Sequence, residues 1–328
     1  MKPLTNKVAV VAGATRGAGR GIARMLGEAG ATVYCTGRST RSKIVQPRTA
    51  DTSPFSLDHR TETIEETAEM VTALGGVGIP VQTDHTDEQQ VERLFQQVRA
   101  EHGKLDILIN DVWGGDALIE TGKPFWELSM EKGLAVLQRA VHTHIITARH
   151  GAPLMVEAQS GVIVEITDAM NFAYMTPWGN LFYDLVKFSV IRLAFVMAQE
   201  LRQHGVAAVA ATPGFLRSEA MLEHFGVTEQ NWEEGAKVDP HFIMSETPNY
   251  LGRGIAGLAA DPNILSKSGQ VFSSWSLARQ YGFTDIDGRQ PDFGRYFATS
   301  QNPDLAAMRE SMTAKHNDFT TAFRGMEW

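Results

Sequence analysis

The sequence predicts an α/β fold with a doubly wound parallel sheet, and three observations support this prediction. Short apolar runs rich in β-branched residues recur along the 328 residues, as is typical of strands buried on both faces. Stretches with helical periodicity lie between them. Strands and helices alternate, which predicts βαβ units with right-handed crossovers and hence one parallel sheet. In such a sheet, ligands bind beyond the carboxyl ends of the strands.

We expect seven strands, at residues 8–12, 32–36, 79–82, 105–110, 162–167, 206–211 and 270–273. We expect helices at residues 20–29, 63–74, 88–101, 130–157, 183–204 and 248–260. Residues 1–275 would then form a single domain. Two long segments, 39–61 and 214–247, exceed a minimal fold and are interpreted as an insertion loop and a substrate lid. The aromatic side chains within residues 276–328 indicate a C-terminal extension that packs on the domain or on a partner subunit.

Composition excludes several classes of protein. A net charge of −8 argues against a surface for nucleic acid or an anionic membrane. The single cysteine, Cys35, rules out an intrachain disulfide and fits a reducing compartment. No apolar run is long enough to span a bilayer, and none resembles a signal peptide. We therefore expect a soluble cytoplasmic protein with a small-molecule substrate and no metal site.

A glycine-rich loop follows the first expected strand, in the run VVAGATRGAGRGIA. Gly13, Gly17 and Gly19 lie between that strand and a helix. Glycine lets the backbone turn tightly and approach a pyrophosphate, and a helix N-terminus offers that anion free N–H groups. A lone glycine triad is often a plain turn, but one placed between a strand and a helix indicates a dinucleotide site.

The end of the second expected strand bears on the choice of cofactor. An NAD-binding chain carries an acidic residue here for the ribose 2′-hydroxyl, yet no Asp or Glu occurs between Glu28 and Asp51. Arg38, and Arg16 in the glycine loop, could instead bind a 2′-phosphate. The pattern favours NADP(H), although Arg38 could also be a solvated loop charge.

A candidate acid/base pair occurs in the run NLFYDLVKF. Tyr183 and Lys187 are four residues apart and would share one face of a helix. A free tyrosine has a pKa of ~10, so proton exchange near neutrality needs a nearby positive charge, which Lys187 could supply. The alternative is a buried tyrosine and a lysine that only reaches to solvent.

In order along the chain, these motifs resemble those of the short-chain dehydrogenase/reductase family. GATRGAG resembles its GxxxGxG loop, TGRS its NADP-preferring members, and YDLVK its YxxxK pair, over about residues 6–273. The resemblance implies a Rossmann-type fold and Tyr183 as the proton donor to a carbonyl or the base on an alcohol. It also implies Lys187 on the nicotinamide ribose, and a homodimer or homotetramer built on helices 130–157 and 183–204.

The resemblance further implies a set of cofactor contacts. TDHTD would bring Asp84 and His85 beside the adenine, and ATPGFLRS resembles the PGxxxT segment that holds the nicotinamide amide and pyrophosphate. The remaining implied contacts, several of them through the backbone, are Gly13, Thr15, Arg16, Gly17, Ala18, Gly19, Arg38, Asn110, Val112, Pro213, Gly214, Leu216 and Ser218.

Two members of the family's catalytic set are missing. Asp168, preceded by Thr167, falls where a serine helps to bind the substrate oxygen. An ionised Asp168 would raise the pKa of Tyr183, a protonated one could donate a hydrogen bond, and either residue could replace the serine. Asp168 could also merely cap a turn or pair with a cation. The assisting asparagine is absent too, and the matching region is 138–142.

Aromatic residues near these positions suggest an apolar substrate wall. Trp113 replaces the glycine of the family's NNAG segment, and Tyr174 and Trp178 lie between Asp168 and Tyr183. Core packing is the alternative for each of them. The sequence thus predicts an NADP(H)-dependent oxidoreductase that interconverts a carbonyl and an alcohol. A non-catalytic NADP(H)-binding regulatory protein of the same fold is the competing hypothesis.

Overall fold

The computed structural model describes residues 2–43, 55, 60–168 and 180–301, together with the single residues 303, 306, 307 and 310. Seven parallel strands form one sheet in the order β3-β2-β1-β4-β5-β6-β7. The strands are β1 (Val8–Ala12), β2 (Thr32–Gly37), β3 (Val77–Gln82), β4 (Ile107–Asn110), β5 (Gly161–Ile166), β6 (Val206–Thr212) and β7 (Val271–Ser273). The winding reverses between β1 and β4, which creates the switch point where ligands bind.

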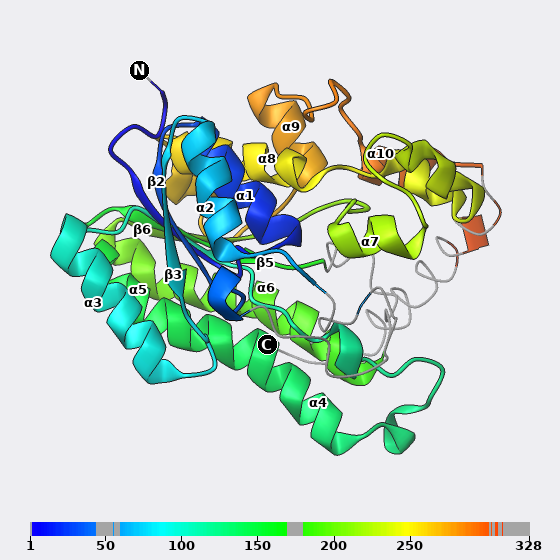
Figure 1. The fold of residues 1–328 in the computed structure, drawn as a ribbon, viewed down its shortest axis with the longest axis horizontal. Helices are drawn as coiled ribbons and strands as arrows, with labels where there is room; N and C mark the ends of the chain where they lie inside the picture. Colours follow the sequence, from blue (N-terminus) through cyan, green and yellow to red (C-terminus); the bar gives the residue numbers. More distant parts are fainter. Residues whose placement is uncertain are drawn as a thin grey trace, which may run out of the picture.

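Helices cover both faces of the sheet (Figure 1). On one face α1 (Gly17–Glu28), α2 (Ile64–Ala73), α8 (Pro248–Ala260) and α9 (Ser274–Tyr281) bury apolar side chains such as Ile22, Val71 and Leu251. On the other face α3 (Glu88–His102), α5 (Thr143–Ala158) and α6 (Leu181–Leu201) bury Phe95, Met155 and Leu201. These two cores confirm the Rossmann-type, doubly wound seven-stranded sheet.

The central strands are buried on both faces, which explains their unbroken apolar sequences. All five residues of β1 and all seven of β6 are buried, whereas those of the edge strand β3 are not. Each predicted strand is present, with its ends shifted by no more than two residues.

The predicted helix 130–157 is interrupted. It begins as α4 (Met130–Leu137), widens into a π-helical turn at Gln138–His142, and continues as α5. The hydroxyl of Thr143, the first residue of α5, donates to the Arg139 carbonyl oxygen within this turn at 2.7 Å. Single π-helical turns often occur at functional sites. This one coincides with residues 138–142, the region that matches the position of the family's assisting asparagine.

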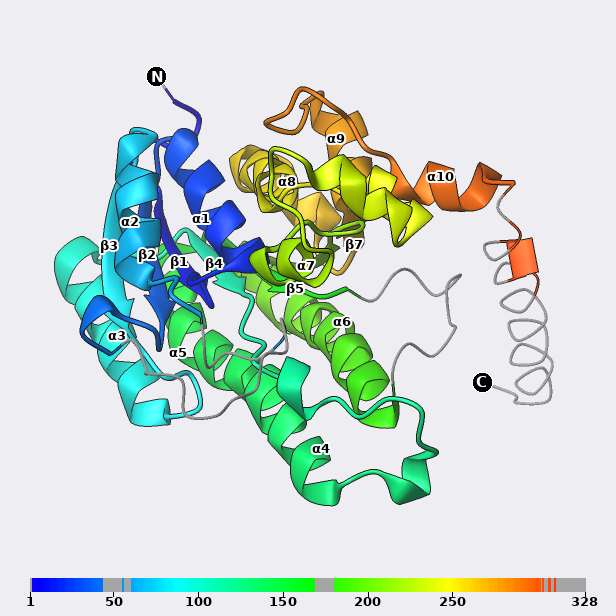
Figure 2. The same cartoon turned by 45° about the vertical axis from the view of Figure 1, so that its right-hand side comes forward.

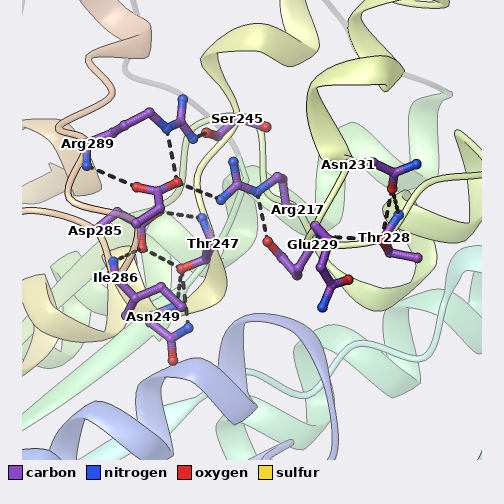
Figure 3. A network of polar contacts seen from close by, with 12 residues as sticks. Arg217, Thr228, Glu229, Asn231, Ser245, Thr247, Asn249, Asp285, Ile286 and Arg289 are labelled. Carbon is purple, nitrogen blue, oxygen red and sulfur yellow. Dashed lines mark hydrogen bonds and ion pairs between the residues drawn. The ribbon is translucent and has the colours of Figure 1, made fainter.

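The segment after β6 contains α7 (Glu219–His224) and two 3₁₀ turns, and it packs against the chain that follows β7 (Figure 2). Buried Arg217 pairs with Asp287 at 3.0 Å, and its guanidinium lies 4.1 Å from the Trp232 ring centre. Arg289 lies 4.2 Å from the same ring. Figure 3 shows the polar contacts around Arg217 and Arg289, among which Asp285 accepts the Thr247 backbone N–H at 2.7 Å. α10 (Phe293–Thr299) packs beside it.

Within the part of the chain that the structure describes, none of the helices is both long enough and apolar enough to cross a membrane.

Candidate active site

The glycine loop connects β1 to α1 at the switch point of the sheet. Gly13 has φ +91°, and a Cβ there would overlap the carbonyl oxygen of Asp111. A Cβ on Gly19 would overlap the Gly13 carbonyl oxygen. Gly17 has φ +58°, and its open side meets nothing closer than the Ser218 Cβ at 4.0 Å. The loop is therefore a tight cradle that opens at the N-terminus of α1, as a dinucleotide pyrophosphate requires.

An internal anion lies at this N-terminus. The Gly17 N–H donates to Oε2 of Glu219 at 2.8 Å, and Oε1 of Glu219 lies 3.8 Å from Nε of Arg20. Sequence reasoning missed Glu219, although it directly follows Ser218, one of the implied pyrophosphate contacts. The Ser218 hydroxyl caps α7 by accepting the Met221 N–H at 3.3 Å.

The two arginines expected at a 2′-phosphate lie in different surroundings. Arg16 is paired: its Nε is 3.4 Å from Glu62, and its Nη2 donates to the Ser39 hydroxyl at 3.5 Å. Arg38 is exposed just beyond β2, and its Nη2 lies 3.6 Å from where a Cβ on Gly114 would be.

A third arginine, which sequence reasoning did not single out, lies beside Arg38. Arg139 comes from the π-helical turn, and its Nη1 donates to the Gly114 carbonyl oxygen at 2.8 Å. Burial, and next the charge of Arg38, lower the pKa of Arg139. Two like charges held together in this way favour an anion between or beside them.

The segment expected near the adenine turns one side chain outward and one inward. Asp84 accepts hydrogen bonds from the Thr86 N–H at 3.0 Å and the Thr86 hydroxyl at 2.7 Å, which fixes the turn. The His85 ring is buried, 2.8 Å from the Thr36 hydroxyl and 2.9 Å from that of Thr147. Burial lowers the pKa of His85 to about 3. The neutral His85 ring is thus part of the buried interior, and only the His85 backbone could contact a ligand.

A buried polar cluster lies behind the end of β4. Asn110 Nδ2 donates to Glu165 at 2.6 Å, and His144 Nδ1 lies 2.6 Å from the other Glu165 oxygen. His144 Nε2 lies 3.1 Å from the Val112 carbonyl oxygen. Burial raises the pKa of Asp111 to about 7, and Lys187 and His144 partly offset this effect. The cluster holds the Val112 backbone in place at the edge of the site.

The candidate catalytic residues meet where β5 ends and α6 begins. Asn180 caps α6 by accepting the Tyr183 N–H at 2.9 Å, which places Tyr183 and Lys187 one turn apart on one face. The Tyr183 hydroxyl donates to one oxygen of Asp168, and Lys187 Nζ lies 2.9 Å from the other. The structure therefore brings Tyr183, Lys187 and Asp168 together.

Trp113 completes this cluster from the loop after β4. Lys187 Nζ lies 3.8 Å from the Trp113 ring centre, within cation–π range. The Trp113 and Tyr183 rings meet edge to face at 5.7 Å, and Trp113 Nε1 donates to Asp116 at 2.6 Å. The indole thus covers the ammonium and borders the Tyr183 ring.

The electrostatics keep Tyr183 protonated in this arrangement. Burial, followed by the charge of Asp168, raises the pKa of Tyr183 above its ordinary value. Thr167 is turned elsewhere, because its hydroxyl donates to the Lys187 carbonyl oxygen at 2.9 Å. Of the two residues considered as a serine replacement, Asp168 is the one that contacts the Tyr183 hydroxyl.

The loop after β6 is held by a buried carboxyl group that sequence reasoning missed. The Gly214 N–H donates to Glu246 at 3.0 Å, and Leu216, three residues after Pro213, bridges to the Glu246 backbone. The Ser274 hydroxyl donates to the same Glu246 oxygen at 2.6 Å. Burial raises the pKa of Glu246 to about 8. The two remaining expected substrate residues, Tyr174 and Trp178, lie outside the described residues.

A glycine cradle at the switch point, with a Tyr–Lys pair across the adjacent strand ends, defines a nucleotide-binding α/β oxidoreductase. The family model described as short chain dehydrogenase matches residues 49–226. A relative from Mus musculus, "Dehydrogenase/reductase SDR family member 1", is 38% identical over 88% of this chain and 85% of its own length. The chain belongs to the short-chain dehydrogenase/reductase family.

Other comparisons agree with this assignment. A "3-oxoacyl-[acyl-carrier-protein] reductase" of Synechocystis is 26% identical over 83% of this chain and 97% of its own length. A short-chain dehydrogenase structure from Mycobacterium thermoresistibile covers 89% of this chain and 92% of its own, with a TM-score of 0.69 and 18% identity, which supports the fold alone. Family membership makes the chain a carbonyl/alcohol oxidoreductase that uses NAD(P)(H) and a small-molecule substrate.

Proposed function

We propose that this chain is an NADP(H)-dependent oxidoreductase that interconverts a carbonyl and an alcohol, with Tyr183 as the general acid/base. The observation that carries the proposal is the meeting of Tyr183, Lys187 and Asp168 where β5 ends and α6 begins. Asp168 contacts both the Tyr183 hydroxyl and the Lys187 ammonium, and the Trp113 ring lies against that ammonium and the Tyr183 ring. This is the arrangement that proton transfer to a substrate oxygen requires.

The cofactor site follows from the glycine cradle. When bound, NADP(H) supplies the hydride that passes to or from the substrate carbon. Gly17, whose open side meets nothing closer than the Ser218 Cβ at 4.0 Å, would leave room for its pyrophosphate, while Gly13 and Gly19 let the loop turn tightly enough to form the cradle. The absence of an acidic residue directly after β2, together with the exposed Arg38, supports NADP(H) over NAD(H).

Asp168 would take the place of the family's serine through its protonation state. As a carboxylate it neutralises Lys187 and accepts a hydrogen bond from the Tyr183 hydroxyl, which favours the neutral phenol. As a carboxylic acid it would donate to a substrate oxygen and leave Lys187 to favour the phenolate. A substrate carbonyl oxygen between Asp168 and Tyr183 would favour the carboxylic acid, because both side chains can donate to that oxygen only while each of them holds a proton.

The test is NADPH consumption by purified protein against a broad panel of ketones, aldehydes and quinones. We expect turnover by the wild type and a loss of about a hundredfold or more in Tyr183→Phe, with NADPH binding unchanged. Asp168→Ser, which restores the family's serine, should keep turnover, whereas Asp168→Ala should lower it. Undiminished turnover in Tyr183→Phe would refute the assigned role of Tyr183.

The alternative is a non-catalytic NADP(H)-binding regulatory protein. The observation that favours it is that the Tyr183 hydroxyl, which should face the substrate, donates its hydrogen bond to the Asp168 carboxylate in this structure. Tight NADPH binding without turnover of any compound in the panel would support this alternative.

We propose a homodimer or homotetramer built on α4 and α5, which follow one another end to end, and on α6, which lies beside them. These helices expose Leu134, Ile145 and Leu185, about half of each side chain being accessible. An exposed apolar face of this kind is typical of a subunit contact.

A cytoplasmic location is proposed on the single buried thiol of Cys35, which makes no disulfide.

A further inference from the structure

We propose that Glu219 is an internal competitor for the cofactor's pyrophosphate and therefore sets the affinity of this chain for its nucleotide. The inference rests on the proposed NADP(H) site at the glycine loop. Its first support is geometric. The Gly17 N–H lies at the N-terminus of α1, where it could donate to a phosphate oxygen of the cofactor. In this structure it donates to the Glu219 carboxylate at 2.8 Å.

The surroundings of Glu219 show why a carboxylate is stable there. The first N–H groups of α1 have no partner within their own helix, and the helix dipole places partial positive charge at that end. Arg20, whose closest ion pair is with Glu66 at 2.7 Å, also adds positive charge here, with its Nε 3.8 Å from the second Glu219 oxygen. Glu219 thus satisfies the same donors and charges that would bind a phosphate.

Glu219 and a pyrophosphate cannot share this position. The Gly17 N–H is a single donor, and both groups are anions that would repel each other at contact distance. Ser218, the implied pyrophosphate contact, lies 4.0 Å from the Cβ position of Gly17, so the start of α7 faces the start of α1 directly. Cofactor binding must therefore displace the Glu219 carboxylate.

This displacement couples the cofactor to the segment after β6. Glu219 is the first residue of α7, and its contact with Gly17 spans 202 positions of sequence. One turn later, Glu223 pairs with Arg60 at 3.0 Å. Release of Glu219 alone would free the start of α7 while its far end stays anchored. The proposed substrate lid would then loosen at the end nearest the cofactor.

The population arithmetic gives the size of the effect. If the state with Glu219 on Gly17 holds about nine-tenths of the molecules, the apparent Kd is about tenfold above the intrinsic one. Removing the Glu219 charge should recover that factor. The gain should require a pyrophosphate on the ligand, because the competition occurs at the α1 N-terminus and not at the adenine end.

The experiment is a titration of the full-length protein with three probes: NADPH, ADP-ribose and 2′-AMP. We expect Glu219→Gln and Glu219→Ala to bind NADPH and ADP-ribose about tenfold more tightly than the wild type does, and 2′-AMP equally well. The matched control is Glu223→Gln on the same helix, which should stay within about twofold of the wild type for all three probes.

The outcomes separate this inference from the proposed function. If the wild type binds NADPH and the Glu219→Gln and Glu219→Ala variants bind it equally well or more weakly, the proposed competition is overturned. The proposed cofactor site is unaffected by that result. An equal gain for 2′-AMP would show a general charge effect and would also overturn it. Failure of every folded variant and of the wild type to bind NADPH would overturn both the site and the inference.

Discussion

The Asp168 carboxylate contacts both partners of the proposed acid/base pair, with one oxygen on the Tyr183 hydroxyl and the other on the Lys187 ammonium. A serine hydroxyl in this position carries no charge, so it could not form an ion pair with Lys187 or place a negative charge beside the Tyr183 hydroxyl. The aspartate therefore changes the electrostatics of the site as well as its shape, because it offsets the positive charge that would favour phenolate. In the proposed mechanism, Tyr183 gives up its proton more readily when Asp168 does not offset the positive charge of Lys187.

Arg38 carries the proposed preference for a phosphorylated ribose. We predict that Arg38→Asp weakens NADPH binding by about ten- to a hundredfold, as expected for loss of a charge-assisted hydrogen bond. NADH binding should change by less than about threefold. Fluorescence titration with both nucleotides measures this ratio.

Arg41→Asp is the matched control for that experiment. Arg41 lies in the same connection but forms a two-pronged pair with exposed Glu69, at 2.6 Å for both contacts. The Arg41→Asp substitution should change NADPH binding and NADH binding by the same factor. Equal losses of NADPH and NADH binding in Arg38→Asp would mean that Arg38 does not recognise the 2′-phosphate.

At the scale of elements, the α4–α5 pair combines two roles. Its π-helical turn directs Arg139 toward Gly114 at the cofactor side, while its outer face exposes apolar residues. A regular helix through residues 138–142 would shift the register of the later residues. The turn therefore decides which side chains face the site and which face outward.

The exposed face predicts the effect of a charge on assembly. We expect Ile145→Glu, on α5, to weaken self-association by about tenfold or more, because a buried unpaired charge costs several kcal/mol at an interface. Val238→Glu is the control, since Val238 is 70% exposed but lies outside α4, α5 and α6. Sedimentation velocity over a concentration series reports the change. A wild type that stays monomeric at micromolar concentration would contradict the proposed oligomer.

At the scale of the whole molecule, buried carboxyl groups give stability a pH dependence. Burial raises the pKa of Glu246 to about 8, whereas an unfolded chain has an ordinary glutamate value of ~4.3. Between these two values the folded chain holds a proton that the unfolded chain has lost. Stability contributed by the protonated group is thus present at low pH and is lost as pH rises toward 8. Asp111, with a pKa of about 7, acts in the same direction.

We predict that Glu246→Gln flattens this dependence. One titrating group changes the free energy of unfolding by up to about 1.4 kcal/mol per pH unit, so the slope between pH 5.5 and 8 should fall by an amount of that order. Urea unfolding at several pH values measures it. Glu233→Gln, at an exposed position, should keep the wild-type slope. A Glu246→Gln slope equal to that of the wild type would remove Glu246 as its source.

Much of the fold could be predicted from local pattern. Buried strands such as β6 carry continuous apolar runs, and caps such as Asp87 and Asn180 mark where helices begin. The glycine loop and the Tyr183–Lys187 pair could also be predicted from the sequence, because each depends on residue spacing within a short segment. These features are determined over a few residues, and the sequence carries them directly.

Contacts between distant segments could not be predicted in this way. Glu219 reaches Gly17, Glu246 reaches Gly214, and Arg139 reaches Gly114 only after the sheet has brought their loops together. His85 had the right position for an adenine contact, yet its ring turns inward to Thr36 and Thr147. Nothing in the spacing of these residues distinguishes a surface side chain from a buried one.

The sequence by itself determined the sheet, its helices, the glycine cradle and the family, because backbone conformation and periodic burial are encoded locally. Only the tertiary structure decided that Asp168, and not Thr167, meets Tyr183, and that Glu219 lies on the α1 N-terminus. Side-chain direction and charge pairing depend on which strand ends and loops come into contact, and that is a property of the packed chain as a whole.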